Sequence, residues 1–291
     1  MWADAGRRPP TTGGHVQEHD DYPAPGRVER RPVDADESAR AGRSWWDGAA
    51  DAYQADHGGF LGDADFVWCP EGLTEAEAGL LGGLDDLRGR RVLEIGGGAG
   101  QCGRWLRAQG VGEVVSFDLS FRQLQHSRRI DEQLGLRLPV VQADAQRLPF
   151  ADAAFDTVFS SFGAFPFVPS ADDALAEATR VLRPGGRLVF SVTHPVRWSF
   201  PDDPTEHGFT VRQSYFDRRA YVEEDDHGNA VYVEHHHTVG DWVRGIAGAG
   251  LVLGDLVEPE WPPGNDRVWG GWGPVRGRMI PGTAIFSADK P

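Results

Sequence analysis

The sequence contains almost no lysine. Lys290 is the only lysine among 29 basic residues, and 44 acidic residues give the 291-residue chain a net charge of -15. A phosphate backbone or an anionic membrane surface would be repelled by this charge before any specific contact formed. We therefore expect neither nucleic acid nor a membrane as a partner.

Cysteine and long apolar runs are also scarce. The two cysteines, Cys69 and Cys102, lack the spacing of a metal site or of a disulfide framework, so we expect reduced thiols. No apolar run reaches the roughly 18 residues that suggest a membrane span, and the first residues do not resemble a signal peptide. These absences predict a cytoplasmic protein without a membrane-spanning segment.

Large apolar residues are nearly missing from residues 1–42, which are rich in proline, glycine, arginine and aspartate. Such a segment cannot offset the entropy lost on ordering, so we expect a disordered tail. Order is expected to begin at Ser44, a candidate N-cap, and a second capping signature joins Thr74 to Glu77. These two helices predict a helical cap over residues 43–90.

What the chain does contain, from residue 91 onward, is a regular alternation of strands and helices. Strand, helix and strand at this spacing predict a parallel sheet covered on both faces. Strands are expected at 92–95, at 114–117 and from residues 139, 155 and 186, with helices at 101–109, at 121–134 and after the N-cap Ser170.

The alternation of strands and helices ends after the fifth strand. Residues 194–237 read as two strands joined by a turn around Gly228, because glycine tolerates the positive φ of a tight hairpin. Thr238 begins a last helix, and two closing strands follow. A single domain over 43–291 is therefore predicted, divided into a cap (43–90), a core (91–193), a substrate-side hairpin lid (194–237) and closing elements (238–291).

The stretch "RVLEIGGGAGQCGRWL" contains a G-x-G-x-x-G at Gly98–Gly103, which is typical of nicotinamide sites. Gly96 intervenes between the strand and Gly98, however, so the pattern is better described as E-x-G-x-G-x-G, starting at Glu94. This arrangement disfavours a nicotinamide oxidoreductase. Asp118 ends the second strand, where a carboxylate can accept both hydrogen bonds of a ribose diol, as either kind of cofactor requires.

A second acidic residue, Asp144, follows the third strand, where an adenine amino group would need an acceptor. Four motifs then occur in order: "LEIGGGAG", "SFDLS", "QADAQRLPFADAAFDTVFSSFG" and "ATRVLRPGGRLVF". Together they resemble the class I S-adenosylmethionine-dependent methyltransferases, and are similar to the small-molecule group that includes the quinone-biosynthesis methyltransferases. The resemblance implies a Rossmann-like seven-stranded sheet with an antiparallel last strand, and S-adenosylmethionine as the cofactor.

The resemblance also implies roles for individual residues. The glycines would let the backbone approach the methionine part of the cofactor, Asp118 would hold the ribose, and Asp144 the adenine. Glu94 would orient the loop. The leading helices of the family often fold over the cofactor, although their aromatic residues could equally be ordinary core. The expected cofactor-binding residues are Tyr53, His57, Glu94, Gly96, Gly98, Gly100, Asp118, Leu119, Asp144, Ala145 and Ser160.

Methyl transfer mainly requires alignment of the nucleophile and exclusion of water, and a hydroxyl acceptor also benefits from a base. Histidine suits that role. His194, at the carboxyl end of the fifth strand, is the leading candidate for catalysis and His236 the second. The alternative for His194 is a ring that only caps the strand end. His235 and His237 face away from His236 on a strand, which disfavours a metal site.

The predicted function is methyl transfer to a small molecule, with O-methylation of an apolar or aromatic metabolite favoured. C- or N-methylation and a non-catalytic cofactor-binding partner protein are the alternatives. Methylation of nucleic acid is disfavoured by the acidic charge and by "SSFGAFPF" after the fourth strand, where an Asn/Asp-Pro-Pro-Tyr motif would stand. Aromatic residues of the insert are candidates for the acceptor wall: Trp198, Phe200, Tyr215, Phe216 and Tyr232.

Overall fold

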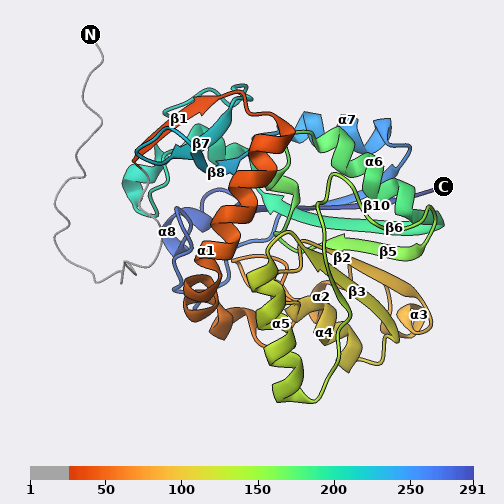
Figure 1. Ribbon diagram of the computed structural model, residues 1–291. Helices are drawn as coiled ribbons and strands as arrows, with labels where there is room; N and C mark the ends of the chain where they lie inside the picture. The colour runs from red at the N-terminus through yellow and green to blue at the C-terminus, as the bar shows by residue number, and fades with distance from the viewer. Residues whose placement is uncertain (1–25) are drawn as a thin grey trace, which may run out of the picture.

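The computed structural model describes residues 26–291 and shows a mixed α/β fold built around a seven-stranded sheet (Figure 1). Its strand order is β4-β3-β2-β5-β6-β10-β9. Strands β2 to β6 pair in parallel, whereas β10 is antiparallel to both of its neighbours, as predicted for the last strand. The strands are β2 Arg91–Ile95, β3 Glu113–Asp118, β4 Val140–Gln142, β5 Phe155–Ser160, β6 Leu182–Thr193, β9 Val252–Val257 and β10 Thr283–Asp289.

Helices cover both faces of the sheet. In Figure 1, α6 and α7 lie on one side, and α4 lies on the other with the short helices α2 and α3. Val158 and Phe159 are adjacent in β5 and enter the two opposite cores, which explains why the parallel strands are continuously apolar. The helices are α2 Glu75–Ala78, α3 Leu84–Leu87, α4 Gln101–Ala108, α5 Phe121–Leu134, α6 Ala171–Val181, α7 Val239–Gly248 and α8 Pro274–Gly277.

The predicted N-caps are confirmed at three helices. Ser170 accepts the backbone N–H of Asp173 at the start of α6. Thr74 and Thr238 begin α2 and α7 with full capping boxes, in which the acidic residue at the third position also accepts the backbone N–H of the threonine. Local hydrogen bonds of this kind can be predicted from sequence because both partners lie within one helical turn.

The prediction of a disordered tail over residues 1–42 is wrong for residues 26–42. Strand β1 (Arg27–Arg31) pairs antiparallel with β7, and helix α1 (Ala35–Leu61) follows it. The N-cap of α1 is Asp34, whose Oδ1 accepts the N–H of Glu37 at 2.8 Å, so the helix begins well before Ser44. Residues 1–25 lie outside the part of the chain that the structure describes.

This N-terminal segment is ordered by distant partners. Arg31 pairs with Glu37 of α1 and with Glu224 of β7. Ala41 of α1 packs in a small core with Val222 and Val233. Because Val222, Glu224 and Val233 come much later in the sequence, the composition of the segment alone did not reveal these contacts.

The predicted hairpin is present at β7 (Ala220–Glu224) and β8 (Ala230–Glu234). Gly228 has a φ of 81° in its turn. With β1 the hairpin forms a separate three-stranded sheet, β1-β7-β8, against which α1 packs. Short 3-10 helices precede it at η1 Phe165–Phe167, η2 Pro195–Ser199 and η3 Glu206–Phe209.

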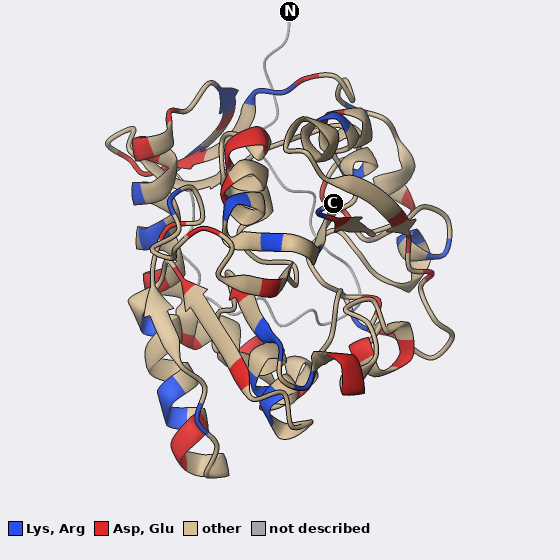
Figure 2. Cartoon of the chain, turned by 90° about the vertical axis from the view of Figure 1, so that its right-hand side faces the viewer, with Lys and Arg blue, Asp and Glu red and all other residues tan. Residues whose placement is uncertain are grey.

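Charged residues are distributed without a single-sign face in the view of Figure 2, where acidic and basic segments are intermixed on the helices and strands. Within residues 26–291, no helix combines the length and the apolar composition needed to cross a membrane.

Candidate active site

A cavity opens at the carboxyl ends of β2, β3 and β5, beneath α1. With its open mouth included, its volume is about 1220 Å³. Strand β2 lies between β3 and β5, so the chain order reverses at this position. Open α/β sheets place their ligands at such a switch point.

The loop after β2 forms the floor of the cavity. Gly96 and Gly98 line it with φ of 64° and 55°, a region that side-chain-bearing residues rarely adopt. A Cβ atom on Gly96 would lie 2.6 Å from the backbone nitrogen of Ala164. Gly100 has no such contact with the cavity: it is the N-cap of α4, and a Cβ there would lie 2.6 Å from Leu138. Its predicted role in cofactor contact is therefore replaced by a packing role.

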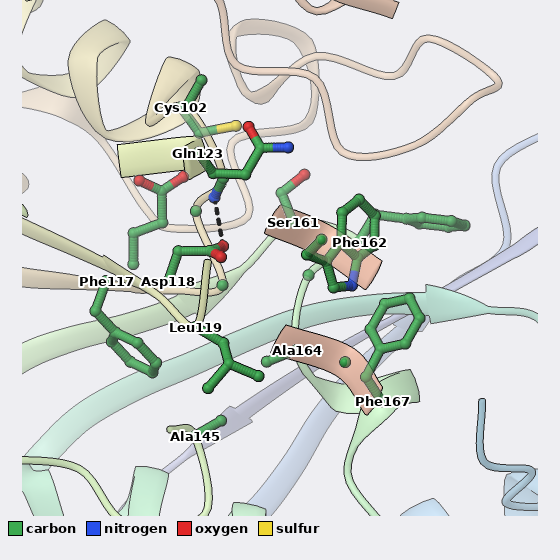
Figure 3. A pocket seen from close by; sticks show the side chains of 18 of the residues that line it. Cys102, Phe117, Asp118, Leu119, Gln123, Ala145, Ser161, Phe162, Ala164 and Phe167 are labelled. Carbon is green, nitrogen blue, oxygen red and sulfur yellow. Dashed lines mark hydrogen bonds between the residues drawn. The ribbon is translucent and has the colours of Figure 1, made fainter. Parts of the chain in front are cut away.

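Asp118 stands at the end of β3 with its carboxylate facing this loop. Oδ2 accepts the N–H of Gly98 at 2.8 Å (Figure 3). Oδ1 accepts the N–H of Ser120, also at 2.8 Å. Burial raises the pKa of Asp118 to about 6, against the opposing effect of these N–H groups. Leu119 lines the cavity next to it, as predicted.

The loop after β4 supplies the next part of the wall. Asp144 and Ala145 line the cavity as expected, and Oδ1 of Asp144 accepts the N–H of Gln146 at 2.9 Å. Figure 3 shows Ala145 beyond Leu119, on the far side from Gln123. Acidic groups at the ends of two neighbouring strands thus border one elongated space.

Glu94 lies at the base of the cavity and is almost completely buried. Burial raises its pKa to about 7. Its Oε2 has no hydrogen-bond partner among the described residues, and a Cβ atom on Gly103 would lie 2.7 Å from it. The glycine therefore makes room for a carboxylate that supports the loop, and a cationic group of a ligand could supply the missing partner.

Helix α1 contributes a wall that the sequence only partly predicted. Tyr53 lines the cavity, as expected. Gln54 links three helices, because its Nε2 donates to Gln123 of α5 at 3.0 Å and its Oε1 accepts from Gln101 of α4 at 3.3 Å. All three amides border the cavity. Their spacing along the sequence gave no signal of this contact.

Aromatic side chains border the cavity away from its acidic end. Figure 3 places Phe162 and Phe167 on the opposite side from Asp118 and Leu119. Phe162 has a φ of 54°, held by a hydrogen bond from its N–H to Ser191 at 2.7 Å. Strained backbone that survives in this way is often part of a functional site. The aromatic lining consists of Trp46, Tyr53, Phe60, Phe117, Phe162, Phe167 and Trp269.

Neither predicted catalytic histidine borders the cavity. The Nδ1 of His194 accepts the N–H of Val196, so its Nε2 carries the proton and donates to Glu258 at 2.8 Å. Nε2 of His236 donates to the backbone oxygen of Tyr215 at 2.7 Å, and the ring packs against Trp198. Burial lowers the pKa of His236 to about 4. The first ring caps η2, and the second lies between Tyr215 and Trp198.

Two further predicted site residues also lie outside the lining. Ser160 is completely buried within the strand end, and the next residue, Ser161, lines the cavity instead and donates to the backbone oxygen of Val67 at 2.7 Å. His57 stacks on Trp269 with ring centroids 3.9 Å apart and an interplanar angle of 11°. The one-residue error at Ser160 reverses the direction of the side chain, since successive strand residues point to opposite faces.

The aromatic residues of the insert, from Trp198 to Tyr232, do not line the cavity. Cys69 and Cys102 do, although composition had indicated only that they are reduced. Burial raises the pKa of both thiols, which keeps them protonated. Over residues 26–291, no group of three or more His, Cys, Asp or Glu side chains is arranged to hold a metal ion.

Comparison with known proteins identifies the core. Residues 93–190 match the family described as "Methyltransferase domain". This part of the chain is similar to that family. It contains the glycine loop, Asp118 and Asp144, so the family match and the cavity coincide. The match supports the predicted class I methyltransferase and S-adenosylmethionine as its cofactor.

Two relatives and one solved structure illustrate the similarity. A demethylmenaquinone methyltransferase of Thermus thermophilus is 38% identical over 130 residues, which are 44% of this chain and 56% of the relative. The ubiquinone/menaquinone biosynthesis C-methyltransferase UbiE of Laribacter hongkongensis is 43% identical over 105 residues, 35% of this chain and 42% of its own length. A putative S-adenosylmethionine-dependent methyltransferase from Listeria monocytogenes has the same fold, with a TM-score of 0.59 and 21% identity over 76% of this chain and 98% of its own.

The chain spans about half the length of the curated relatives that it matches. The family match covers the glycine loop, Asp118 and Asp144. Helix α1 and Trp269, which form much of the remaining wall, lie outside residues 93–190. The similarity therefore describes the cofactor half of the cavity, and the other half has to be interpreted from its own residues.

Proposed function

We propose that this protein transfers a methyl group from S-adenosylmethionine to a carbon atom of a small, electron-rich aromatic acceptor. The observation that carries the proposal is the division of one cavity into two parts. One part has the glycine loop and two carboxylates after β2, β3 and β4, and the other is walled by aromatic side chains from α1, the loop after β5 and the Trp269 segment.

The residues of the first part fit the proposed cofactor. Asp118 would hold the ribose hydroxyls, Asp144 the adenine amino group, and Gly96 and Gly98 leave space for the methionine part. The unpartnered Oε2 of Glu94 suits a cofactor that carries positive charge. Bound S-adenosylmethionine supplies a methyl group activated by a sulfonium, which an acceptor takes in one displacement that leaves S-adenosylhomocysteine and releases one proton.

The second part favours an acceptor that needs no protein base. Among the described residues that line the cavity there is no histidine, and the thiols of Cys69 and Cys102 stay protonated. A hydroxyl with an ordinary high pKa would react slowly here. A ring carbon conjugated with an acidic hydroxyl brings its own nucleophile. The relative from Laribacter hongkongensis, which is named as a C-methyltransferase, is consistent with this. O-methylation is the second candidate.

The test uses 1,4-dihydroxynaphthalene under a reducing atmosphere with methyl-labelled S-adenosylmethionine. A product with the label on ring carbon, in which the displaced ring hydrogen leaves as the proton, supports the proposal. A methoxy product assigns the transfer to oxygen. The variant Asp118→Asn tests the cofactor site and keeps the size of the side chain. It should weaken binding of S-adenosylhomocysteine by about tenfold or more, because an amide offers fewer acceptor sites to the ribose.

Binding and turnover are measured on the same preparations. If wild-type protein fails to bind S-adenosylhomocysteine in isothermal titration, the methyltransferase proposal is wrong. If it binds the cofactor product but methylates none of a panel of naphthols, phenols and amines, the non-catalytic alternative is favoured over enzymatic transfer.

A further inference from the structure

The segment between β9 and α8 presents one tryptophan to the cavity. The N–H of Trp269 donates to the backbone oxygen of Trp272 at 2.8 Å, and the N–H of Trp272 donates back at 3.0 Å. The turn between them contains Gly270 with a φ of 56°. Trp269 lines the cavity, so this closed turn fixes the backbone that carries its indole.

The indole ring is held by aromatic residues of α1. The His57 imidazole is stacked flat against it, with centroids 3.9 Å apart. Tyr53 meets both rings edge-on, at 6.2 Å from Trp269 and 4.8 Å from His57. Phe60 approaches the indole at 5.8 Å with an interplanar angle of 68°. One face of the indole is therefore covered by a ring that does not itself line the cavity.

Trp269 lies in the part of the cavity that we assign to the acceptor. The groups suited to the cofactor, from Gly96 to Asp144, lie in the matched methyltransferase domain, whereas Trp269 adjoins the carboxyl-terminal half of α1. A flat, rigid, apolar surface supported from behind suits stacking of a second flat ring. A flexible aliphatic acceptor would gain little from it.

We propose that Trp269 is the stacking platform that selects a planar aromatic acceptor, and that His57 is a positioning residue that holds the indole in place. This inference rests on the proposed methyl transfer. The ring of His57 is half-buried, and desolvation lowers its pKa, so a neutral imidazole faces the indole near pH 7. Neutral rings stack here without the cost of burying a charge.

The experiment compares four variants of the full chain: Trp269→Ala, Trp269→Phe, His57→Ala and His57→Phe. With 1,4-dihydroxynaphthalene as acceptor, Trp269→Ala should raise the acceptor KM by roughly tenfold, with a smaller change in kcat. Trp269→Phe should recover most of this loss. His57→Ala should raise KM about threefold and His57→Phe, which keeps a flat ring behind the indole, should restore it.

The matched control is Val268→Ala, because Val268 precedes the indole in sequence, is 46% exposed and does not line the cavity. The acceptor KM of this variant should equal that of the wild type. The dissociation constant of S-adenosylhomocysteine should stay within about twofold in all five variants, which shows that the fold and the cofactor half are intact.

The outcomes separate the two proposals. If Trp269→Ala has an unchanged acceptor KM with normal turnover and cofactor binding, the proposal that Trp269 is the stacking platform is wrong. The proposed methyl transfer is unaffected by this result. If the wild type does not bind S-adenosylhomocysteine, the proposed function itself is wrong. Turnover of an aliphatic alcohol or amine in preference to every aromatic probe overturns the planar acceptor class while leaving the methyltransferase proposal intact.

Discussion

Asp118 illustrates how one side chain can serve both the loop and a ligand. A carboxylate offers about four lone-pair directions, and the N–H groups of Gly98 and Ser120 occupy one on each oxygen. One acceptor position per oxygen remains, which matches the two hydroxyls of a ribose. The bond to Gly98 also fixes the loop before a ligand arrives, so little ordering should be needed on binding.

The histidines show the opposite outcome. His194 follows a strand end at the edge of the sheet where ligands bind, and this position made it the leading catalytic candidate. Glu258, from the segment after β9, accepts its Nε2 proton and turns the ring away from the cavity. The sequence positions of the two residues gave no indication of this pairing, which depends on the antiparallel placement of the closing strands.

The first prediction tests this correction. His194→Ala should leave kcat/KM within about twofold of the wild type, because the ring borders no part of the cavity. The free energy of unfolding should fall by about 1 kcal/mol, since the N–H of Val196 and the Glu258 carboxylate lose a partner. Turnover and urea unfolding of the same variant measure both. A loss of more than a hundredfold in kcat with intact cofactor binding would restore His194 as the base.

At the scale of elements, the accuracy of the sequence predictions depended on how far apart the interacting residues lie in the sequence. The helices at α2, α6 and α7 were predicted because Thr74, Ser170 and Thr238 each bond within one turn. Strand β1 was missed because its register partner for Arg27 is Glu224, at the far end of the chain. The sequence of β1 is polar, so only the pairing makes it a strand.

The second prediction concerns the segment that was expected to be disordered. A chain that begins at residue 43 loses β1, the Asp34 cap and Ser38, which lines the cavity and bonds to His235 at 2.9 Å. We expect weaker binding of S-adenosylhomocysteine, by about tenfold or more, and a lower melting temperature, because the cap alone contributes about 1 kcal/mol.

The matched control for this truncation is a chain that begins at residue 26 and therefore keeps all the contacts described above. Its affinity and melting temperature should equal those of the full chain. Equal affinity of the chain that begins at residue 43 would show that the first turns of α1 contribute nothing to the cofactor pocket.

At the scale of the whole molecule, the alternation of strands and helices predicted the sheet and its switch point, because each βαβ connection can return in essentially one way. The cavity-lining residues that we propose for the cofactor were predicted with it, since they lie in consecutive motifs from Gly96 to Ala145. The acceptor wall was expected in the aromatic residues of the insert, which do not line the cavity, and the half that we propose for the acceptor lies elsewhere. It combines α1, the Cys69 segment and Trp269, which meet only after the closing strands have placed the last of them.

The last prediction concerns how ionisation of the buried Glu94 changes the free energy of unfolding of the domain with pH. Its pKa is about 7 in the folded protein and 4.5 in its ordinary, exposed state. Between these values the folded state holds a proton that the unfolded state releases, so the contribution of Glu94 to stability falls as pH rises through this window. Below about pH 4.5 both states are protonated, and above about pH 7 the loss is complete.

The isosteric variant Glu94→Gln removes this titration. The free energy of unfolding of the variant is compared with that of the wild type by urea unfolding. The difference in favour of the variant should grow by on the order of 2–3 kcal/mol from pH 4 to pH 8. Glu77→Gln is the control of opposite sign, because hydrogen bonds from Thr74 lower the pKa of the exposed Glu77. That carboxylate stabilises the fold above its ordinary pKa, so its variant should lose stability over the same range. If Glu94→Gln shows no gain, Glu94 is solvated or paired in solution, and the unpartnered oxygen at the base of the cavity is not available to a cationic ligand.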